Sequence, residues 1–151
     1  MKYNFGAGPC ILPQTVFKQA ADAVLDFNGL SLLEVSHRSP EFVQVMEEAQ
    51  DLVKKALNVP DGYSILFLQG GASLGFTIAA LNMMRSTKKA GYINTGTWAN
   101  GAIGEAKAVG VDVNVFASSE DKNFNYIPNG FDVPTDVDYI HYTSNNTIFG
   151  T

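Results

Sequence analysis

The 151-residue sequence is poor in the residues that build disulfides, metal centres and nucleic-acid-binding surfaces. Cys10 is its only cysteine, so the sequence contains no internal disulfide and no multi-cysteine metal site. Its only arginines are Arg38 and Arg85, and its lysines are scattered. A nucleic-acid-binding surface needs concentrated positive charge, and the formal net charge is −5, so we expect neither nucleic acid nor a metal as a partner.

Long hydrophobic runs are also missing. No apolar run reaches the roughly 18 residues of a membrane span. The first residues, Met-Lys-Tyr-Asn-Phe-Gly, lack the apolar core of a signal peptide. We therefore expect a cytoplasmic protein that does not contact a membrane. Hydrophobic residues make up 46% of the chain and charged residues 17%, which is typical of a globular domain.

The most informative stretch is Ile65–Phe76, which reads ILFLQGGASLGF. Its first four residues form a short apolar run that is typical of a buried parallel strand. Gly70 and Gly71 then allow a positive φ and a close approach of the backbone to a ligand. A helical spacing of apolar residues follows, at Leu74, Ile78, Leu81 and Met84.

A strand, a glycine turn and a helix N-terminus together direct backbone N–H groups at one point, which suits a phosphate. Ser73 is expected to cap the helix and to offer its hydroxyl to the anion. A plain turn without a ligand explains the stretch about equally well. No Gly-Lys-Ser/Thr follows, and the glycines do not fit G-x-G-x-x-G. Neither a P-loop nucleotide nor a dinucleotide is therefore favoured.

Two helices are expected before this stretch. One covers residues 13–27 and is stopped by Asn-Gly, and the other starts at Ser39-Pro40 and ends at Asn58. His37 and Arg38 stand directly before the second helix. A histidine, an arginine and free backbone donors at a helix start would bind an anion, although a solvated basic pair is the simpler explanation.

Three further strands are expected after it, at Ala90–Asn94, Val111–Ala117 and Tyr139–Tyr142. A helix from Trp98 to Val109 lies between the first two, and Gly110 ends it. With residues 65–68 this gives four strands that alternate with helices. The sequence therefore predicts an α/β fold with a parallel sheet.

Ligands of open parallel sheets bind beyond the carboxyl ends of the strands. The residues Thr95–Trp98 follow one strand and Asn145–Thr147 follow another. Trp98 is able to stack on a flat ring or to pack in the core, and Asn145–Thr147 suit either ligand oxygens or a turn. With Gly70–Ser73, these loops suit a phosphorylated flat cofactor. His141 lies inside a strand, and we expect it to be packed rather than catalytic.

Five segments carry a resemblance, and they run through the whole chain: Asn4–Pro9 with Leu12-Pro13, Glu34–Ser39, Phe67–Ser73, Asn94–Trp98 and His141–Ile148. Together they resemble pyridoxal-phosphate (PLP) enzymes of the aspartate-aminotransferase fold, and most of all the phosphoserine aminotransferase family. The resemblance implies a three-layer α/β architecture with a mainly parallel sheet. Residues 1–12 would be an N-terminal arm. Residues 13–151 would be part of the large PLP-binding domain of a fold-type-I aminotransferase, without its remainder and without the small domain.

The resemblance also implies roles for individual residues. Ala72 and Ser73 would hold the cofactor phosphate, Trp98 would stack on the pyridine ring, and Thr147 would bond near the phenolic oxygen. Some family members carry arginine in place of Ser73, and the family commonly has glutamate where this chain has Asn146.

The implied substrate-binding residues are His37 and Arg38, which would bind the substrate phosphate, in the neighbouring subunit of a homodimer. The family interconverts 3-phosphohydroxypyruvate and glutamate with phosphoserine and 2-oxoglutarate in serine biosynthesis. In many bacteria it also serves pyridoxine biosynthesis.

Transamination needs a Schiff-base lysine and an acid on the pyridine nitrogen. None of the lysines in this sequence lies in a strand-end motif. We therefore expect the N-terminal part of such an enzyme, with no catalytic residue in this chain and no activity by itself. Another PLP enzyme of the same fold, or a non-catalytic α/β module for phosphate binding or dimerisation, are the alternatives.

Overall fold

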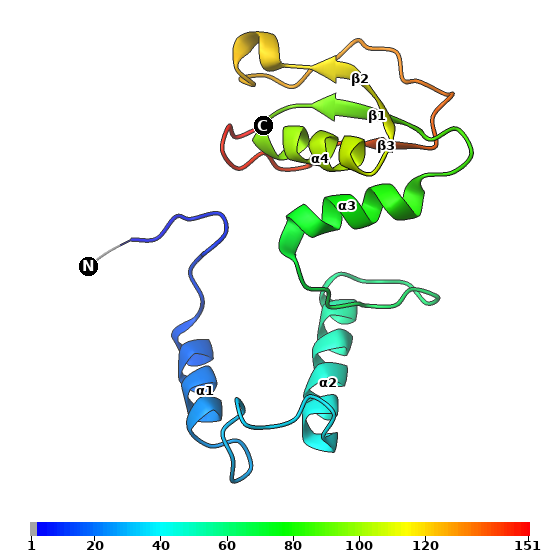
Figure 1. Cartoon of the computed structure of the whole chain (residues 1–151). Coiled ribbons are helices and arrows are strands. Elements are labelled where there is room, and N and C mark those ends of the chain that lie inside the picture. The colour runs from blue at the N-terminus through cyan, green and yellow to red at the C-terminus, as the bar shows by residue number, and fades with distance from the viewer. Residues whose placement is uncertain (1–2) are drawn as a thin grey trace. The chain divides into compact units, whose positions relative to one another are not determined.

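The computed structural model describes residues 3–151, which divide into two compact units on either side of the Phe67–Leu68 bond (Figure 1). We call residues 3–67 the N-terminal unit and residues 68–151 the C-terminal unit. The first contains α1 (Gln14–Leu25) and α2 (Pro40–Ala56). The second contains, in order, α3 (Gly71–Met83), β1 (Lys89–Asn94), α4 (Thr97–Ala108), β2 (Asp112–Ser118), the short 3-10 helix η1 (Glu120–Lys122) and β3 (Tyr139–His141).

The helices of the N-terminal unit begin and end close to the predicted residues. The Ser39 hydroxyl accepts a hydrogen bond of 3.3 Å from the N–H of Phe42, and Pro40 is the first residue of α2. These two features confirm the predicted cap. The first helix stops at Leu25, shortly before the Asn-Gly turn. None of the described helices is long and apolar enough to cross a membrane.

The N-terminal unit has no buried residue among those described. The apolar stripe predicted for α2 is half-buried at Phe42, Met46 and Val53, but Leu52 is exposed. Helix α1 is amphipathic as predicted, yet its apolar residues Phe17 and Val24 are also exposed. Amphipathic helices normally bury their apolar stripe, so these two helices present faces suited to a further layer of protein.

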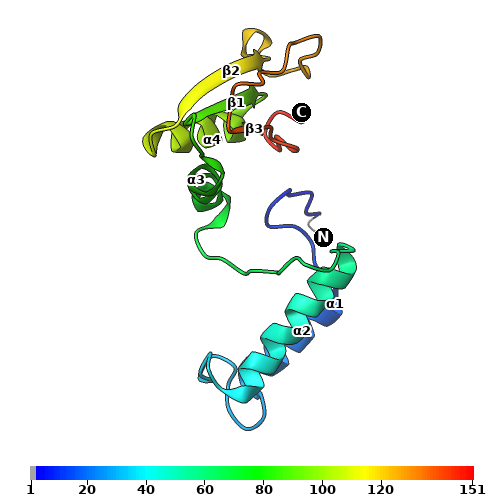
Figure 2. The same cartoon turned by 90° about the vertical axis from the view of Figure 1, so that its right-hand side faces the viewer.

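The C-terminal unit is built on a three-stranded parallel sheet in the order β2-β1-β3. Tyr92 at the centre of β1 is paired with His141 of β3, and Ala90 is paired with Val113 of β2. Both α3 and α4 lie on the same side of the sheet (Figure 1 and Figure 2). The predicted parallel α/β arrangement is therefore confirmed for these three strands.

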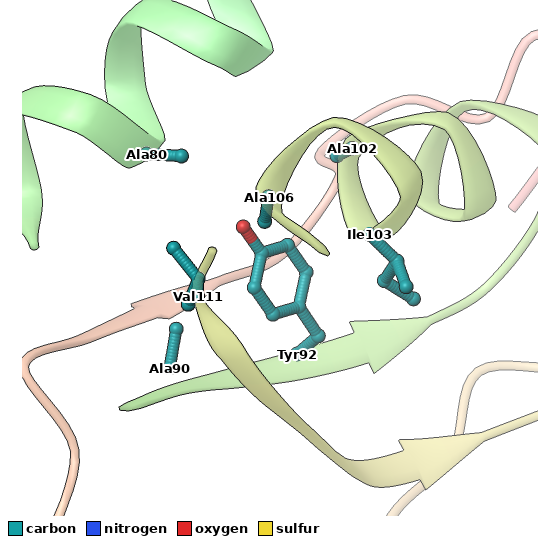
Figure 3. Packing of buried hydrophobic residues seen from close by; sticks show 7 residues of the cluster. All are labelled: Ala80, Ala90, Tyr92, Ala102, Ile103, Ala106 and Val111. Atoms are coloured by element: carbon teal, nitrogen blue, oxygen red, sulfur yellow. The ribbon is translucent and has the colours of Figure 1, made fainter. Parts of the chain in front are cut away.

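The core lies between this face of the sheet and the two helices (Figure 3). Tyr92 is its largest side chain, and its hydroxyl shares a 2.9 Å hydrogen bond with the hydroxyl of Tyr139. Its neighbours in the core are small or aliphatic: Ala80, Ala90, Ala102, Ile103, Ala106 and Val111. Because α4 contributes mostly alanines to the contact, the helix approaches the sheet closely enough to enclose the tyrosine ring.

The predicted strand at Ile65–Leu68 is wrong. These residues have no regular secondary structure, and Leu66 and Leu68 are exposed. A strand needs a neighbour for its backbone N–H and C=O groups, and none of the described strands pairs with this segment. The apolar run alone therefore does not produce a strand.

The helix predicted after Ser73 is confirmed as α3, but the four apolar residues that predicted it are not all buried. Leu74 and Leu81 are exposed, whereas Phe76, Ala80 and Met84 pack into the core. These three core residues are spaced four residues apart, so they too lie on one helical face. The apolar residues of α3 are distributed around the whole helix. Their spacing in the sequence therefore does not identify the face that packs against the sheet.

The start of β3 is tied to the loop between α3 and β1 by one carboxylate. Asp138 accepts hydrogen bonds from the backbone N–H groups of Arg85, Thr87 and Lys88, at 2.6, 3.1 and 2.9 Å. Desolvation alone would raise the pKa of Asp138, but hydrogen bonds from the Thr87 side chain and from these backbone groups outweigh it and lower the pKa. The ionised carboxylate thus fixes the register of β3 beside β1.

We expect Asp138→Ala to lower the thermal midpoint of the full-length protein by several degrees, because three backbone donors lose their acceptor. Asp136→Ala is the matched control. Asp136 forms only a surface ion pair with Lys89, and such pairs contribute little. Calorimetry measures the thermal midpoints of both variants. Equal decreases would show that the hydrogen bonds to Asp138 contribute no more to stability than the surface ion pair of Asp136.

Candidate functional site

The carboxyl edge of the sheet brings together two of the predicted ligand-binding loops. Strands β1 and β3 are parallel neighbours, so the loops that follow them leave the sheet on the same side. Figure 1 shows the C-terminal loop beside the start of α4 on this side. The residues Thr95–Trp98 and Asn145–Thr147 therefore meet, as the sequence predicts.

Trp98 and Thr147 are joined directly. The indole Nε1–H of Trp98, in the first turn of α4, donates a 2.9 Å hydrogen bond to the Thr147 hydroxyl oxygen. An indole N–H is only a donor, so the Thr147 oxygen must accept, and the hydroxyl hydrogen remains free to donate to another group. The side chain of Trp98 is 42% exposed, so it is not the core residue that we weighed as an alternative.

Thr95 and Asn146 form a second, buried link between the same loops. The Asn146 side-chain N–H₂ donates a 2.7 Å hydrogen bond to the Thr95 hydroxyl, and Asn146 is 1% exposed. The sequence predicts Asn146 in a ligand-facing loop or a turn and does not predict this burial. The only feature of the sequence that could have indicated this link is that Thr95 and Asn146 are polar residues that each follow a strand. Their burial depends on how segments far apart in the sequence pack together.

The start of α3 presents free backbone donors. Gly70 and Gly71 have φ angles of 96° and 61°, so both adopt the left-handed conformation that the glycine pair predicts. Gly70 is the N-cap, and Ser73 lies inside the helix, so the prediction that Ser73 caps it is wrong. The backbone N–H groups of Ala72 and Ser73 have no acceptor in the described part of the chain, as is usual in a first turn.

Helices α3 and α4 both begin on the side toward which the arrows of β1 and β2 point in Figure 1. The free N–H groups of α3 thus belong to the same edge of the C-terminal unit as Trp98 and Thr147. A helix N-terminus with unpaired N–H groups attracts anions. The edge therefore combines an anion-binding turn, an exposed aromatic face and a hydroxyl that is free to donate.

His141 is packed, as predicted. Its ring stacks on Tyr92 with the ring centres 5.0 Å apart, and the edge of Phe76 meets it at 5.8 Å. Its Nδ1 is buried without a hydrogen-bond partner in the described residues. Burial lowers the pKa of His141, because the charged imidazolium loses its hydration there. The neutral ring therefore supports the sheet behind the site.

This lowered pKa predicts that acid destabilises the fold. The unfolded chain has the ordinary histidine pKa of about 6.5, so it binds the proton more readily than the folded protein. Stability is then lost as the pH falls through about 6.5. We expect the thermal midpoint to drop less between about pH 7 and 5 in His141→Phe than in the parent protein. A parallel drop in both proteins would contradict this role, and His37→Phe is the control for replacing an exposed histidine.

The predicted substrate-binding pair lies in the N-terminal unit. His37 and Arg38 are both exposed and stand directly before α2, as the sequence predicts. The backbone N–H of Arg38 donates a 3.3 Å hydrogen bond to the Ser36 hydroxyl, which shapes the turn. Neither side chain forms an ion pair with a carboxylate of the described residues. Both side chains are therefore available to an anion.

In the part of the chain that the structure describes, no group of three or more His, Cys, Asp or Glu side chains is placed to hold a metal ion. The donors at the carboxyl edge are backbone amides, a hydroxyl and an indole. Such groups bind anions and ligand oxygens rather than cations.

A family model described as "Aminotransferase class-V" matches residues 2–151. The phosphoserine aminotransferase of Flavobacterium psychrophilum is 58% identical over 153 residues, which cover 99% of this chain and 43% of that protein. The enzyme of the same name from Porphyromonas gingivalis is 58% identical over 156 residues, with the same coverage. The chain thus spans about 43% of the length of these curated relatives.

Solved structures agree with this match. A phosphoserine aminotransferase studied for radiation damage of its Schiff base is 40% identical, with a TM-score of 0.90 over 100% of this chain and 43% of the other. A PLP-bound phosphoserine aminotransferase from Trichomonas vaginalis is 33% identical, with a TM-score of 0.86 over 97% of this chain and 42% of the other. These likenesses confirm the predicted α/β aminotransferase fold.

Proposed function

The chain belongs to the aminotransferase class-V family, and from this premise we propose that the protein containing it is a phosphoserine aminotransferase. It would transfer the amino group of glutamate to 3-phosphohydroxypyruvate and release phosphoserine and 2-oxoglutarate, in serine biosynthesis and also in pyridoxine biosynthesis. Residues 1–12 would form the arm and residues 13–151 part of the large PLP-binding domain.

The first turn of α3 fits the phosphate of PLP. The N–H groups of Ala72 and Ser73 are free, and the two left-handed glycines before them let a ligand approach the backbone. The Ser73 hydroxyl is exposed and adds a further donor. A phosphate here would receive hydrogen bonds without displacing any that the described residues make.

The hydrogen bond between Trp98 and Thr147 is the observation that carries the proposal. It holds an exposed indole ring beside a hydroxyl whose hydrogen is free. The ring of Trp98 would stack on the pyridine, and Thr147 would donate to the phenolic oxygen. PLP, when bound, supplies an electron sink for the amino acid that reacts. Trp98 and Thr147 would hold the ring in place and keep water from its stacked face.

His37 and Arg38 would bind the substrate phosphate in the site of a neighbouring subunit of a homodimer. Their free side chains and the exposed apolar faces of α1 and α2 support this proposal. None of the lysines lies in the loops Gly70–Ser73, Thr95–Trp98 and Asn145–Thr147. We therefore propose that the catalytic lysine lies outside these 151 residues and that the segment does not catalyse by itself.

Competing acceptor substrates test the proposal. The full-length protein is assayed with glutamate and, in turn, 3-phosphohydroxypyruvate, hydroxypyruvate and pyruvate. The proposed contacts of His37 and Arg38 with the phosphate predict that kcat/KM favours the phosphorylated acceptor by at least about a hundredfold. Equal use of the three acceptors would support another aminotransferase of the same fold. PLP binding without any turnover would support a non-catalytic module.

A further inference from the structure

The buried side chain of Asn146 lies between the two loops that carry Trp98 and Thr147. Its Nδ2 donates to the Thr95 hydroxyl at 2.7 Å, three residues before Trp98 in the chain. Asn146 itself directly precedes Thr147. A single side chain thus links the two loops close to the residues that face the ligand.

The position of Asn146 is fixed on the side of Gly96. A Cβ atom on Gly96 would lie 2.7 Å from the Asn146 Oδ1, and φ at Gly96 is 154°. Only a glycine therefore leaves room for the amide in this packing. The Oδ1 is buried and has no hydrogen-bond partner in the described residues, so the Nδ2 bond to Thr95 is the side chain's polar contact within the described chain.

The backbone around Asn146 strengthens the same link. Its N–H donates to the carbonyl oxygen of Thr151 at 2.6 Å, and its carbonyl oxygen accepts from the N–H of Gly150 at 2.8 Å. The Thr151 hydroxyl then donates to the carbonyl oxygen of Thr95 at 2.8 Å. The loop after β3 is therefore closed on itself and attached to the end of β1 at two points.

We propose that Asn146 is a positioning residue for the cofactor site, an inference that rests on the proposed function. It touches no reacting group. Through Thr95 it holds Thr147 at hydrogen-bond distance from the Trp98 indole, so that the Thr147 hydroxyl stays an acceptor from Trp98 and a donor to the ligand. When the Thr95–Asn146 bond is lost, the Trp98–Thr147 bond lengthens or breaks, although neither of those residues has changed.

The indole N–H resonance of Trp98 reports this directly. The full-length protein is labelled with ¹⁵N-tryptophan, studied both free of cofactor and loaded, and the Trp98 signal is assigned with Trp98→Phe. Thr147→Val removes the acceptor and gives the position of the signal when the bond is broken. Thr95→Val removes the Thr95 hydroxyl at nearly constant volume, and Asn146→Ala removes the amide.

We expect Thr95→Val and Asn146→Ala each to move the Trp98 signal at least halfway toward its Thr147→Val position. The double variant should move it no further than the larger single effect, because both changes break one link. The PLP dissociation constant should rise about tenfold in each, as for the loss of one buried hydrogen bond. Asn82→Ala is the control, since its amide bonds only within α3 and is exposed.

A Trp98 signal that stays at its parent position in Thr95→Val would overturn the inference, even if Asn146→Ala fails to fold. Additive shifts in the double variant would also overturn it. The signal in the cofactor-free protein decides the inference alone. Failure of the parent protein to bind PLP would instead refute the proposed function.

Discussion

Trp98→Ala is expected to raise the PLP dissociation constant of the full-length protein ten- to a hundredfold. Stacking of a flat ring on an aromatic side chain contributes about 1–3 kcal/mol, or about five- to 150-fold in affinity, and the expected change lies within these limits. The indole is exposed at the carboxyl edge of the sheet and hydrogen-bonded to Thr147, so its orientation is already fixed before a ligand binds. Equilibrium dialysis or titration of the cofactor-free protein measures the effect.

Trp98→Phe separates stacking from orientation. It keeps an aromatic face but removes the N–H that bonds to Thr147, so we expect a loss between those of the parent and the alanine variant. Tyr63→Ala is a control for removing an exposed aromatic ring from the N-terminal unit, and its affinity should equal that of the parent. If Trp98→Ala bound PLP as tightly as the parent, the stacking role would be wrong.

Arg38→Ala is expected to raise KM for 3-phosphohydroxypyruvate by about a hundredfold. Removal of a charge-assisted hydrogen-bond donor from a phosphate costs about 2–3 kcal/mol, which corresponds to this loss. Hydroxypyruvate lacks the phosphate, so its KM should change little. Steady-state kinetics with both acceptors gives the ratio.

Two further variants sharpen this test. Arg38→Lys keeps the charge but loses the planar pair of donors, so we expect an intermediate KM. Arg85→Ala is the matched control, because Arg85 is the other arginine of the chain and only its backbone N–H bonds to Asp138. Equal KM increases for both acceptors in Arg38→Ala would show that the side chain does not recognise the phosphate.

Local signals predicted most of the regular elements. Ser39-Pro40 marks the start of α2, and the Ser39 hydroxyl makes the expected cap. The glycine at position 110 follows the end of α4 and has a φ of 88°. Such caps and breakers act within a few residues, so they remain readable without knowledge of the rest of the fold.

Elements that depend on distant partners were predicted less well. The apolar run at residues 65–68 looks like a strand, but no described strand pairs with it. Helix α3 is apolar on all sides, and only the packed sheet shows that Phe76 and Ala80 face inward. Hydrophobic spacing selects a buried face only where the opposite face is polar.

The candidate site also contains features that the sequence predicts and features that depend on the packing of distant segments. The rule that parallel strands end at one edge predicted that the loops of Trp98 and Thr147 lie at the same edge of the sheet, but not that the two side chains are hydrogen-bonded. The burial of Asn146 against Gly96 and Thr95 depends on how two loops fold over each other. Nothing in the residue order distinguishes that asparagine from its exposed neighbour Asn145.

A crystal structure of the full-length protein with PLP tests the central claim most directly. We expect the pyridine ring to lie about 3.5–4.0 Å from the Trp98 indole, the usual contact distance of stacked carbon atoms. We also expect the phosphate at the N–H groups of Ala72 and Ser73 and the phenolic oxygen at the Thr147 hydroxyl. PLP bound elsewhere, or at this edge without contact to Trp98 and Thr147, would contradict the account.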